Sequence, residues 1–361
     1  MNIAQVAPLM ESVPPRYYGG IERVASYLTE ALVAQGHDVT LFASGDSETS
    51  ATLIPCCAQA LRLNGAVRDW IPYHMVMLDK VRRRAHEFDI IHFHVDVLHF
   101  PLFRDIAHRT LTTLHGRQDL PDHLPFYAAF PEMPLVSISD AQRAPMPNVS
   151  FAATVYNAIP RDLLRPVPRP RGGYLAFLGR ISPEKGIEPA IRIARATGIP
   201  LKVAAKVDPV DADYFKQIEP LLSDPLVEFV GEIDDRRKQE FLGEALGLLF
   251  PIDWPEPFGL VMIEAFACGT PVLAFRRGSV PEIIEDDVTG FAVGSEAEAC
   301  AKVPALLALD RGRVRERFAQ RFAASRMARD YMNLYKAAAG DHKDGHALRR
   351  APARGGAARA L

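Results

Sequence analysis

The sequence lacks several features that would assign it to a specialised class of protein. It holds only four cysteines, Cys56, Cys57, Cys268 and Cys300, and their spacing forms neither a zinc motif nor a disulfide framework. No apolar stretch reaches the length that spans a bilayer, and the first residues lack the basic start of a signal peptide. We therefore expect a cytoplasmic protein.

The sequence also lacks a strong charge of either sign. Its formal net charge is −2, which argues against a basic surface for nucleic acid. Its basic run at residues 80–84 is explained by a solvated helix face. We expect neither a nucleic-acid partner nor membrane association. With 361 residues, 48% of them hydrophobic and 24% charged, the chain is long enough for two globular domains.

Apolar strands and amphipathic helices alternate in the first half of the chain. Residues 1–7 and 38–44 predict strands, and the helix between them, from about Ile21, carries Val24, Leu28 and Leu32 at helical spacing. A strand, a helix and a strand in so short a stretch form a parallel crossover unit. Further strands are predicted at residues 89–94, 110–114 and 135–139.

The second half repeats this alternation after a domain boundary. Residues 165–173 are rich in Pro and Arg and have no apolar period. Apolar runs at 174–179, 201–205, 227–230, 246–250 and 271–275 predict strands covered on both faces. The fold class is therefore α/β, with two Rossmann-like, doubly wound domains at residues 1–165 and 166–325. Ligands of such domains bind at the carboxyl ends of the strands, and hence in the cleft between the domains.

The end of the chain is a charged amphipathic helix followed by a polar tail. Residues 311–339 predict the helix, with a break near Ser325. Periodicity leaves open whether its last part, residues 326–340, stays on the second domain. Residues 341–361 hold no core side chains, and we expect them to be disordered.

A loop with two cations follows the first strand of the second domain. Arg180 and Lys185 lie in Gly-Arg-Ile-Ser-Pro-Glu-Lys-Gly at residues 179–186. An arginine fork and a lysine point charge at the end of a parallel strand are suited to clamp a diphosphate. The alternative is a solvated turn in which Glu184 pairs with a neighbour.

Two carboxylates stand eight residues apart further along. Glu256 precedes Pro-Phe-Gly, which breaks a strand and opens a helix, and Glu264 lies on that helix. The segment offers backbone N–H groups to anionic oxygens and carboxylates to sugar hydroxyls. The alternative is a strand-to-helix joint whose acidic residues only complement the helix dipole.

Taken together, these motifs resemble the retaining GT-B glycosyltransferases of family 4 (GT4). The resemblance covers nearly the whole folded chain, from the Tyr18–Glu22 loop to the last helix. It implies two Rossmann-like domains that face each other across a cleft, with a nucleotide-sugar donor on the second and an acceptor on the first. It also implies that the helix at 326–340 crosses back to the first domain.

The resemblance further implies a role for each matching residue. Arg180 and Lys185 would hold the diphosphate, Glu264 would accept from the ribose hydroxyls, and Glu256 would contact the donor sugar. The backbone around this sugar and phosphate would come from Phe258, Gly259 and Leu260, with Gly19 and Gly20 approaching from the first domain. His115, which ends the strand at 110–114, would lie near the donor sugar, although a lone histidine is often structural.

Three further features have plainer readings. His92 and His94 share one strand face but have no third ligand at suitable spacing, so we expect no metal there. Ser139 and Gln142 predict a capping box at a helix start. Lys206 replaces a small residue of the family's glycine-rich loop, and we expect it to reach the donor phosphates or the acceptor.

The sequence therefore predicts a retaining hexosyltransferase that uses a nucleoside diphosphate sugar. UDP-glucose is favoured over GDP-mannose on family frequency, no obligatory metal or other cofactor is expected, and the acceptor is a small molecule or glycan. A soluble acceptor is favoured over a lipid because no strongly basic, apolar surface is evident in the first domain. The alternatives are a nucleotide-sugar 2-epimerase and a non-catalytic nucleotide-sugar sensor. A dinucleotide oxidoreductase is disfavoured because the first strand leads into no Gly-x-Gly-x-x-Gly turn.

Overall fold

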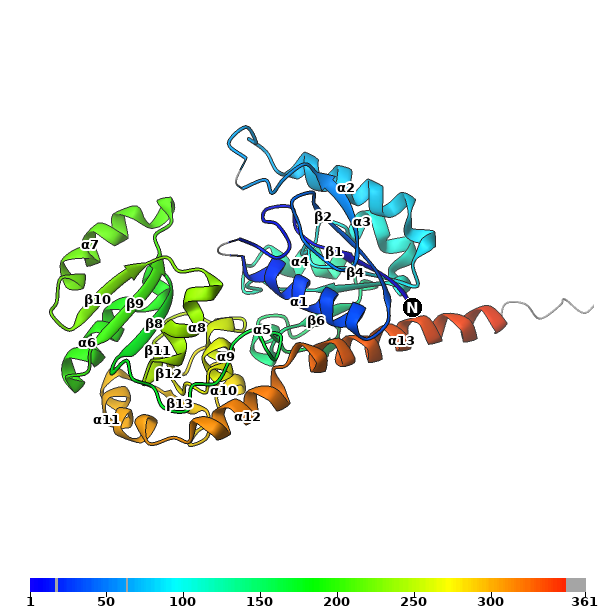
Figure 1. The fold of residues 1–361 in the computed structure, drawn as a ribbon. Helices are drawn as coiled ribbons and strands as arrows, with labels where there is room; N and C mark the ends of the chain where they lie inside the picture. The colour runs from blue at the N-terminus through cyan, green and yellow to red at the C-terminus, as the bar shows by residue number, and fades with distance from the viewer. Residues whose placement is uncertain (17–18, 63, 349–361) are drawn as a thin grey trace, which may run out of the picture.

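The computed structural model describes residues 1–16, 19–62 and 64–348, with side chains to residue 340. Tyr17 and Tyr18 of the expected glycine loop, and residues 349–361 of the expected tail, lie outside the described residues. The chain forms two α/β domains side by side, each built around a parallel sheet (Figure 1). This confirms the predicted GT-B class of two Rossmann-like domains.

The first domain has a seven-stranded parallel sheet with the order β3-β2-β1-β4-β5-β6-β7. Its strands are β1 Asn2–Val6, β2 Asp38–Ser44, β3 Thr52–Cys57, β4 Ile90–Phe93, β5 Thr110–Thr113, β6 Leu135–Ser137 and β7 Phe151–Thr154. Its helices are α1 Gly20–Ala34, α2 Ile71–Arg83, α3 Phe100–Phe103, α4 His123–Ala129 and α5 Asp140–Arg143, with 3-10 turns η1 Ala85–Glu87 and η2 Arg104–Arg109. The central strands β4 and β5 are buried along their whole length and β1 is buried after Asn2, which accounts for their apolar sequences.

The second domain has a six-stranded parallel sheet with the order β10-β9-β8-β11-β12-β13. Its strands are β8 Leu175–Arg180, β9 Leu201–Lys206, β10 Val227–Gly231, β11 Gly247–Phe250, β12 Val272–Phe275 and β13 Gly290–Val293. Its helices are α6 Ile187–Thr197, α7 Ala212–Leu222, α8 Asp235–Gly243, α9 Leu260–Ala267, α10 Val280–Ile283, α11 Glu296–Leu307 and α12 Arg311–Arg321, with 3-10 turns η3 Pro183–Lys185 and η4 Pro209–Asp211. In both sheets the chain turns back beside its first strand, which places a ligand crevice at the carboxyl ends of β1 and β8.

The last helix, α13 Ala324–Leu348, leaves the second domain and runs along the first (Figure 1). The expected break falls at Phe322 and Ala323, where Ile159 N–H donates to the Phe322 carbonyl at 3.0 Å and Ala324 N–H donates to that of Ile159 at 2.9 Å. Beyond this point α13 packs against α1 and β4, with Tyr331 and Tyr335 fully buried. The helix continues to Leu348, so residues 341–348 are helical rather than part of a disordered tail.

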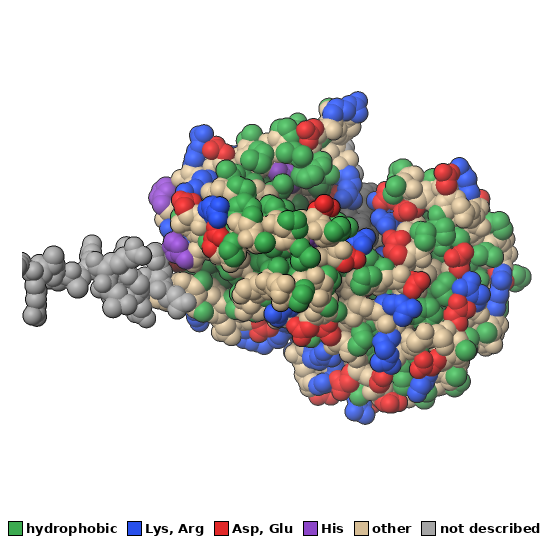
Figure 2. Space-filling view, turned by 180° about the vertical axis from the view of Figure 1, so that it is seen from behind, with side chains coloured by type: hydrophobic (Ala, Val, Ile, Leu, Met, Phe, Trp, Pro, Cys, Tyr) green, Lys and Arg blue, Asp and Glu red, His purple; other side chains and the backbone are tan. Residues whose placement is uncertain are grey.

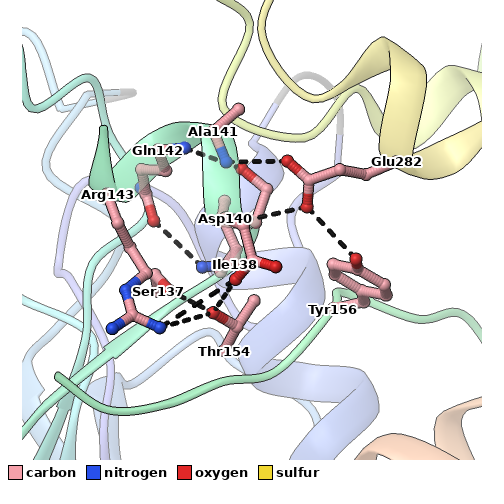
Figure 3. Close-up of polar contacts among 10 residues, drawn as sticks. Ser137, Ile138, Asp140, Ala141, Gln142, Arg143, Thr154, Tyr156 and Glu282 are labelled. Atoms are coloured by element: carbon pink, nitrogen blue, oxygen red, sulfur yellow. Dashed lines mark hydrogen bonds and ion pairs between the residues drawn. The ribbon is translucent and has the colours of Figure 1, made fainter. Parts of the chain in front are cut away.

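A second link between the domains is the carboxylate of Glu282 on α10 (Figure 3). Its two oxygens accept hydrogen bonds from the backbone N–H groups of Asp140 at 2.8 Å and Ala141 at 2.7 Å, at the start of α5. The Tyr156 hydroxyl donates to the same carboxylate at 3.1 Å. Ser139 caps α5 by accepting from the Gln142 N–H at 3.0 Å, which confirms the cap, whereas the Gln142 side chain accepts from the Ile138 N–H at 2.9 Å and not from that of Ser139 as a capping box would require.

This link reaches both walls of the space between the domains. On the first domain, the Gln142 amide donates to the carbonyl of Leu114 at 3.0 Å and to that of Gly116 at 2.8 Å, on either side of His115. On the second, Ser279, which precedes α10, donates its backbone N–H to the Glu256 carbonyl at 3.0 Å. Glu282 therefore ties the segment that carries His115 to the segment that carries Glu256.

Substituting Glu282 by glutamine should loosen this link without removing a core side chain. The amide keeps one acceptor oxygen but turns an NH₂ group towards the second backbone N–H, which loses a charge-assisted hydrogen bond of about 1.5–3 kcal/mol. We expect hydrogen exchange at Asp140 and Ala141 to become about tenfold faster or more. Glu285→Gln is the matched control because Glu285 pairs with Arg317 at 2.6 Å inside the second domain. Equal exchange in the two variants would contradict this role of Glu282.

Candidate active site

A cavity of about 890 Å³ lies between the two domains. Figure 2 shows the hollow between the two lobes, with charged side chains of both signs at its rim. The structure brings every residue proposed from the sequence to this cavity. Its lining includes Gly19, Gly20, His115, Arg180, Lys185, Lys206, Glu256, Phe258, Gly259, Leu260 and Glu264.

The cations at the carboxyl ends of β8 and β9 stand side by side. Arg180 and Lys206 are partners in the register of the two strands. Arg180 pairs with Glu184 at 2.7 Å and with Asp211 at 3.3 Å, while the ammonium of Lys206 lies 3.4 Å from the Asp208 carboxylate. The pairing of Arg180 with Glu184 is the one considered in the solvated-turn alternative, and it occurs here at the edge of the cavity rather than on an outer surface.

Lys185 reaches across its loop to Glu256. Its ammonium lies 2.7 Å from Glu256 Oε2, which also accepts a hydrogen bond from Trp254 Nε1 at 2.9 Å. The two charged side chains are only 17% and 12% exposed, so solvent screens the pair less than a surface pair. The turn after Lys185 requires glycine, because Gly186 has φ 76° and a Cβ there would lie 2.0 Å from the Pro251 carbonyl oxygen.

Glu264 is paired in the same way, by residues that sequence reasoning missed. Its Oε1 accepts from Lys238 Nζ at 2.8 Å, and Lys238 also lies 3.2 Å from Asp235. Arg23, from α1 of the first domain, forms an ion pair with Asp235 across the cleft. Although burial acts in the opposite direction, Lys238 and Arg23 hold the pKa of Asp235 below its usual value.

The signal for these missed residues is weak in the sequence. Asp235 and Lys238 lie three residues apart near the start of a helix, which is the ordinary spacing of a surface ion pair. Arg23 lies one turn into a long helix without any motif around it. Only the approach of α1, α8 and α9 in three dimensions turns these residues into one charged group beside the cavity.

The start of α9 faces the cavity, as the Pro-Phe-Gly sequence predicts. Gly259 caps this helix with φ 80°, and a Cβ there would lie 2.8 Å from Met262 Cε, so both conformation and space favour glycine. Gly20 approaches from the first domain, since a Cβ on it would lie 3.9 Å from Leu260 Cδ1. The glycine loop and the helix start therefore face each other across a narrow gap.

Histidine side chains line the first-domain side of the cavity. His94 and His115 line it, and their rings are joined by a 2.8 Å hydrogen bond between His94 Nδ1 and His115 Nε2. His92 instead bonds Tyr335 and Thr113, each at 2.7 Å. Burial lowers the pKa of all three and brings that of His115 to about 3, so these rings are neutral near pH 7.

Two features of the described residues bear on ligands. The described residues contain no group of three His, Cys, Asp or Glu side chains that could hold a metal ion, and none of their helices is long and apolar enough to cross a bilayer.

The sequence predicts no basic, apolar surface on the first domain, but α2 exposes apolar side chains in its first half and carries basic residues in its last turn. Trp70, at the start of α2, also lines the cavity. The exposed residues are Trp70, Ile71, Tyr73, Met75 and Val76.

The buried histidines predict a loss of stability in mild acid. His92, His94 and His99 have folded pKa values well below the ordinary 6.5, because burial disfavours the charged ring. Their contribution is present above about pH 6.5 and is lost as the pH falls towards the folded pKa values, because only the unfolded chain takes up the protons. Each adds up to about 1.4 kcal/mol of destabilisation per pH unit. Urea unfolding at pH 7.0 and 5.5 measures this, and equal free energies of unfolding at the two values would contradict it.

Two family profiles match the chain in sequence. "Glycosyl transferases group 1" matches residues 165–323, and "Glycosyltransferase Family 4" matches residues 18–144. A phosphatidyl-myo-inositol mannosyltransferase of Propionibacterium freudenreichii is 28% identical over 365 residues, covering 87% of this chain and 90% of the relative. A D-inositol 3-phosphate glycosyltransferase of Mycobacterium tuberculosis is 33% identical over 168 residues, covering 42% of this chain and 33% of the relative.

Solved structures share the arrangement of both domains. Sucrose-phosphate synthase of Thermosynechococcus elongatus has a TM-score of 0.76 at 20% identity, covering 93% of this chain and 98% of the other. Anabaena HepE in complex with UDP-glucose has a TM-score of 0.69 at 17% identity, covering 93% and 100%. At these identities the likeness shows the fold, and the profiles add the family. The chain belongs to the group 1 glycosyltransferases of family 4, with the GT-B fold.

Proposed function

We propose that this protein is a retaining hexosyltransferase that takes its sugar from a nucleoside diphosphate sugar. UDP-glucose is the favoured donor and GDP-mannose the second candidate. The observation that carries the proposal is the arrangement of charges on the second-domain side of the cavity, where Lys185 is paired with Glu256 and Lys238 with Glu264. A ligand that presents phosphate oxygens to the cations and hydroxyls to the carboxylates satisfies both members of each pair.

The proposed chemistry places charge stabilisation on the leaving group. As the bond between the anomeric carbon and the phosphate oxygen breaks, negative charge grows on the nucleoside diphosphate. Arg180 and Lys185 lie at the carboxyl-end loop of β8, where they stabilise that charge more in the transition state than in the ground state. Glu264, deeper on α9, takes the ribose hydroxyls, and Glu256 takes the sugar.

Retention is proposed to occur by displacement on one face of the sugar. The acceptor oxygen bonds to the anomeric carbon on the side from which the diphosphate departs, and the departing phosphate oxygen takes the acceptor's proton. Glu256 and Glu264, the carboxylates paired with Lys185 and Lys238, both lie on the second-domain side of the cavity. A covalent intermediate would instead require a nucleophile on the opposite face, and trapping of a glycosyl-enzyme would contradict the proposal.

The names of similar proteins support both donor candidates. Anabaena HepE has been solved with UDP-glucose, and the Propionibacterium relative is named as a mannosyltransferase.

The sequence favours a soluble acceptor because it shows no basic, apolar surface in the first domain. The exposed apolar side chains of α2 remove this reason. The named relatives include a phosphatidyl-myo-inositol mannosyltransferase and a D-inositol 3-phosphate glycosyltransferase. We propose a hydroxylated acceptor and let the experiment compare soluble and lipid-linked forms.

The alternatives have less support. A 2-epimerase needs an acid and a base at the sugar, and a His115 pKa of about 3 leaves no imidazolium near neutral pH to serve as the acid. A sensor without catalysis does not need cations that favour a leaving diphosphate. Neither alternative is suggested by the names of the relatives.

Thermal unfolding with a panel of nucleoside diphosphates and their sugars tests the function. A ligand at 100 times its dissociation constant adds about 2.7 kcal/mol of stability, so the cognate donor should raise the unfolding temperature by several degrees. The best donor is then incubated with inositol, inositol phosphate and phosphatidylinositol, and the anomeric configuration of any product is read by NMR. No stabilisation by any nucleotide, or an inverted product, would overturn the proposal.

The proposed role of Glu264 has a test of its own. Glu264→Ala should weaken binding of UDP about tenfold, the value of one hydrogen bond to a charged group. Because this variant also releases Lys238, the comparison uses UDP and its 2′,3′-dideoxyribose analogue. The wild type should prefer UDP, and the variant should bind the two alike, by calorimetry. Glu240→Ala, on the exposed side of α8, is the control that should keep the preference. An unchanged preference in Glu264→Ala would exclude the ribose role.

A further inference from the structure

A row of buried side chains connects His115 at the cavity to the last helix of the chain. From the cavity inwards, His115 Nε2 lies 2.8 Å from His94 Nδ1, and His94 Nε2 lies 2.8 Å from Gln5 Oε1. The Gln5 Nε2 group then donates to the Tyr335 hydroxyl at 3.1 Å. Gln5 and Tyr335 are 0% exposed and His94 is 1% exposed, so the bonds of Gln5 are shielded from water, while His115 is half-buried at the cavity.

The row continues past Tyr335 along α13. The Tyr335 hydroxyl lies 2.7 Å from His92 Nδ1, and His92 Nε2 lies 2.7 Å from Thr113 Oγ1. Thr113 Oγ1 in turn lies 2.7 Å from the Tyr331 hydroxyl. Strands β1, β4 and β5 and helix α13 thus each contribute to one continuous set of hydrogen bonds.

The side-chain amide of Gln5 gives this row a direction. Its oxygen can only accept a hydrogen bond, so His94 Nε2 must carry a proton and donate it. A neutral imidazole has one donor and one acceptor, which leaves His94 Nδ1 as a bare acceptor. The proton between His94 and His115 must then belong to Nε2 of His115.

One nitrogen of His115 remains for the cavity. Its Nε2 is turned to His94, and its Nδ1 forms no hydrogen bond with any residue that the structure describes. Since the ring is neutral and Nε2 holds its single proton, Nδ1 carries a lone pair. At the cavity His115 is therefore a hydrogen-bond acceptor and not a donor.

We propose that Gln5 and His94 are positioning residues that fix His115 as its Nε2–H tautomer, so that Nδ1 accepts a hydrogen bond from a hydroxyl of the bound sugar. Tyr335 takes part by accepting from the Gln5 amide nitrogen while its own O–H donates to His92 Nδ1. With its single proton directed to His92, the Tyr335 hydroxyl has only an acceptor to offer Gln5, which keeps the amide oxygen towards His94. A helix at the far end of the sequence therefore sets the hydrogen-bonding character of a side chain in the cleft.

The opposite orientation of Gln5 shows what the arrangement prevents. If the amide turned by 180°, its NH₂ group would donate to His94, His94 Nδ1 would donate to His115, and His115 would present an N–H to the cavity. The backbone would be the same and every donor–acceptor distance could be kept. The choice between an acceptor and a donor at the sugar thus rests on the Gln5 amide and on the residue that holds it.

The tautomer can be measured directly on the full-length protein with ¹⁵N-labelled histidine. Long-range ¹H–¹⁵N spectra distinguish a protonated from a bare ring nitrogen, and loss of signals in His115→Ala identifies the residue. We expect Nε2–H for His115 in the wild type without ligand. An Nδ1–H tautomer would overturn the proposal.

Two variants then test what holds the tautomer. Tyr335→Phe removes the hydroxyl that accepts from Gln5 and also bonds His92, and Gln5→Leu removes the amide; each should give His115 a mixture of tautomers. Thr112→Val is the matched control, because Thr112 lies buried on the same strand as Thr113 but bonds His99 at 2.8 Å, outside this row. If Gln5→Leu does not fold, Tyr335→Phe alone decides. Wild-type tautomers in the variants would overturn the proposal.

Activity provides a second readout, which rests on the proposed function. Tyr335→Phe should lower kcat/KM for transfer about three- to tenfold, the value of one neutral hydrogen bond. In a His115→Ala background the same substitution should have no further effect, since the two act through one contact. Additive losses would overturn the positioning role. The NMR measurement needs no turnover, so it stands apart from a failure of the proposed function.

Discussion

The charged side chains that line the cleft neutralise one another in pairs, and ligand binding has to replace these pairs. Lys185 lies against Glu256 and Lys238 against Glu264, each pair largely shielded from water. Separating such a pair is costly unless a ligand replaces both partners, because a buried charge without a partner loses several kcal/mol. An anion alone frees a carboxylate, and a neutral sugar alone frees a cation. The proposed donor, a nucleotide sugar, carries both kinds of group, so we expect its two halves to depend on each other in binding.

The connections between the domains set how these pairs face the first-domain side of the cavity. Helix α13 joins the end of the second domain to the core of the first, and Tyr335 places a hydroxyl from that helix inside the first sheet. Glu282 makes a shorter connection from α10 to the start of α5. The first reaches His115 through the Gln5 row, and the second reaches the carbonyls of Leu114 and Gly116, on either side of His115, through the Gln142 amide. Movement of the domains should therefore alter the position of His115, the residue that we propose to contact the sugar.

Sequence reasoning located the parts of the site that lie at the ends of buried strands. The runs at 174–179, before Arg180, and at 246–252, before the loop that holds Glu256, are apolar, so the ends of these strands were clear and the polar residues that follow them stood out. It missed β3, β7 and β13: β3 and β7 are half-exposed strands without a continuous apolar run, and Pro55 interrupts the first. It also missed Lys238 and the Gln5 row, because contacts between distant elements have no local pattern. His92 and His94 were recognised as a pair, but their partners became visible only with α13 in place.

The most direct test of this account is the affinity of Glu256→Gln for UDP, measured by calorimetry at fixed ionic strength. If Lys185 is held by Glu256 until a diphosphate arrives, removing the carboxylate charge should tighten UDP binding by about 1 kcal/mol, roughly fivefold, while transfer falls. Asp253 lies on the same loop as Glu256 and forms an exposed ion pair with Arg277. Asp253→Asn should therefore leave UDP affinity unchanged. Unchanged or weaker UDP binding in Glu256→Gln would contradict the central claim that Lys185 and Glu256 neutralise each other until a diphosphate binds.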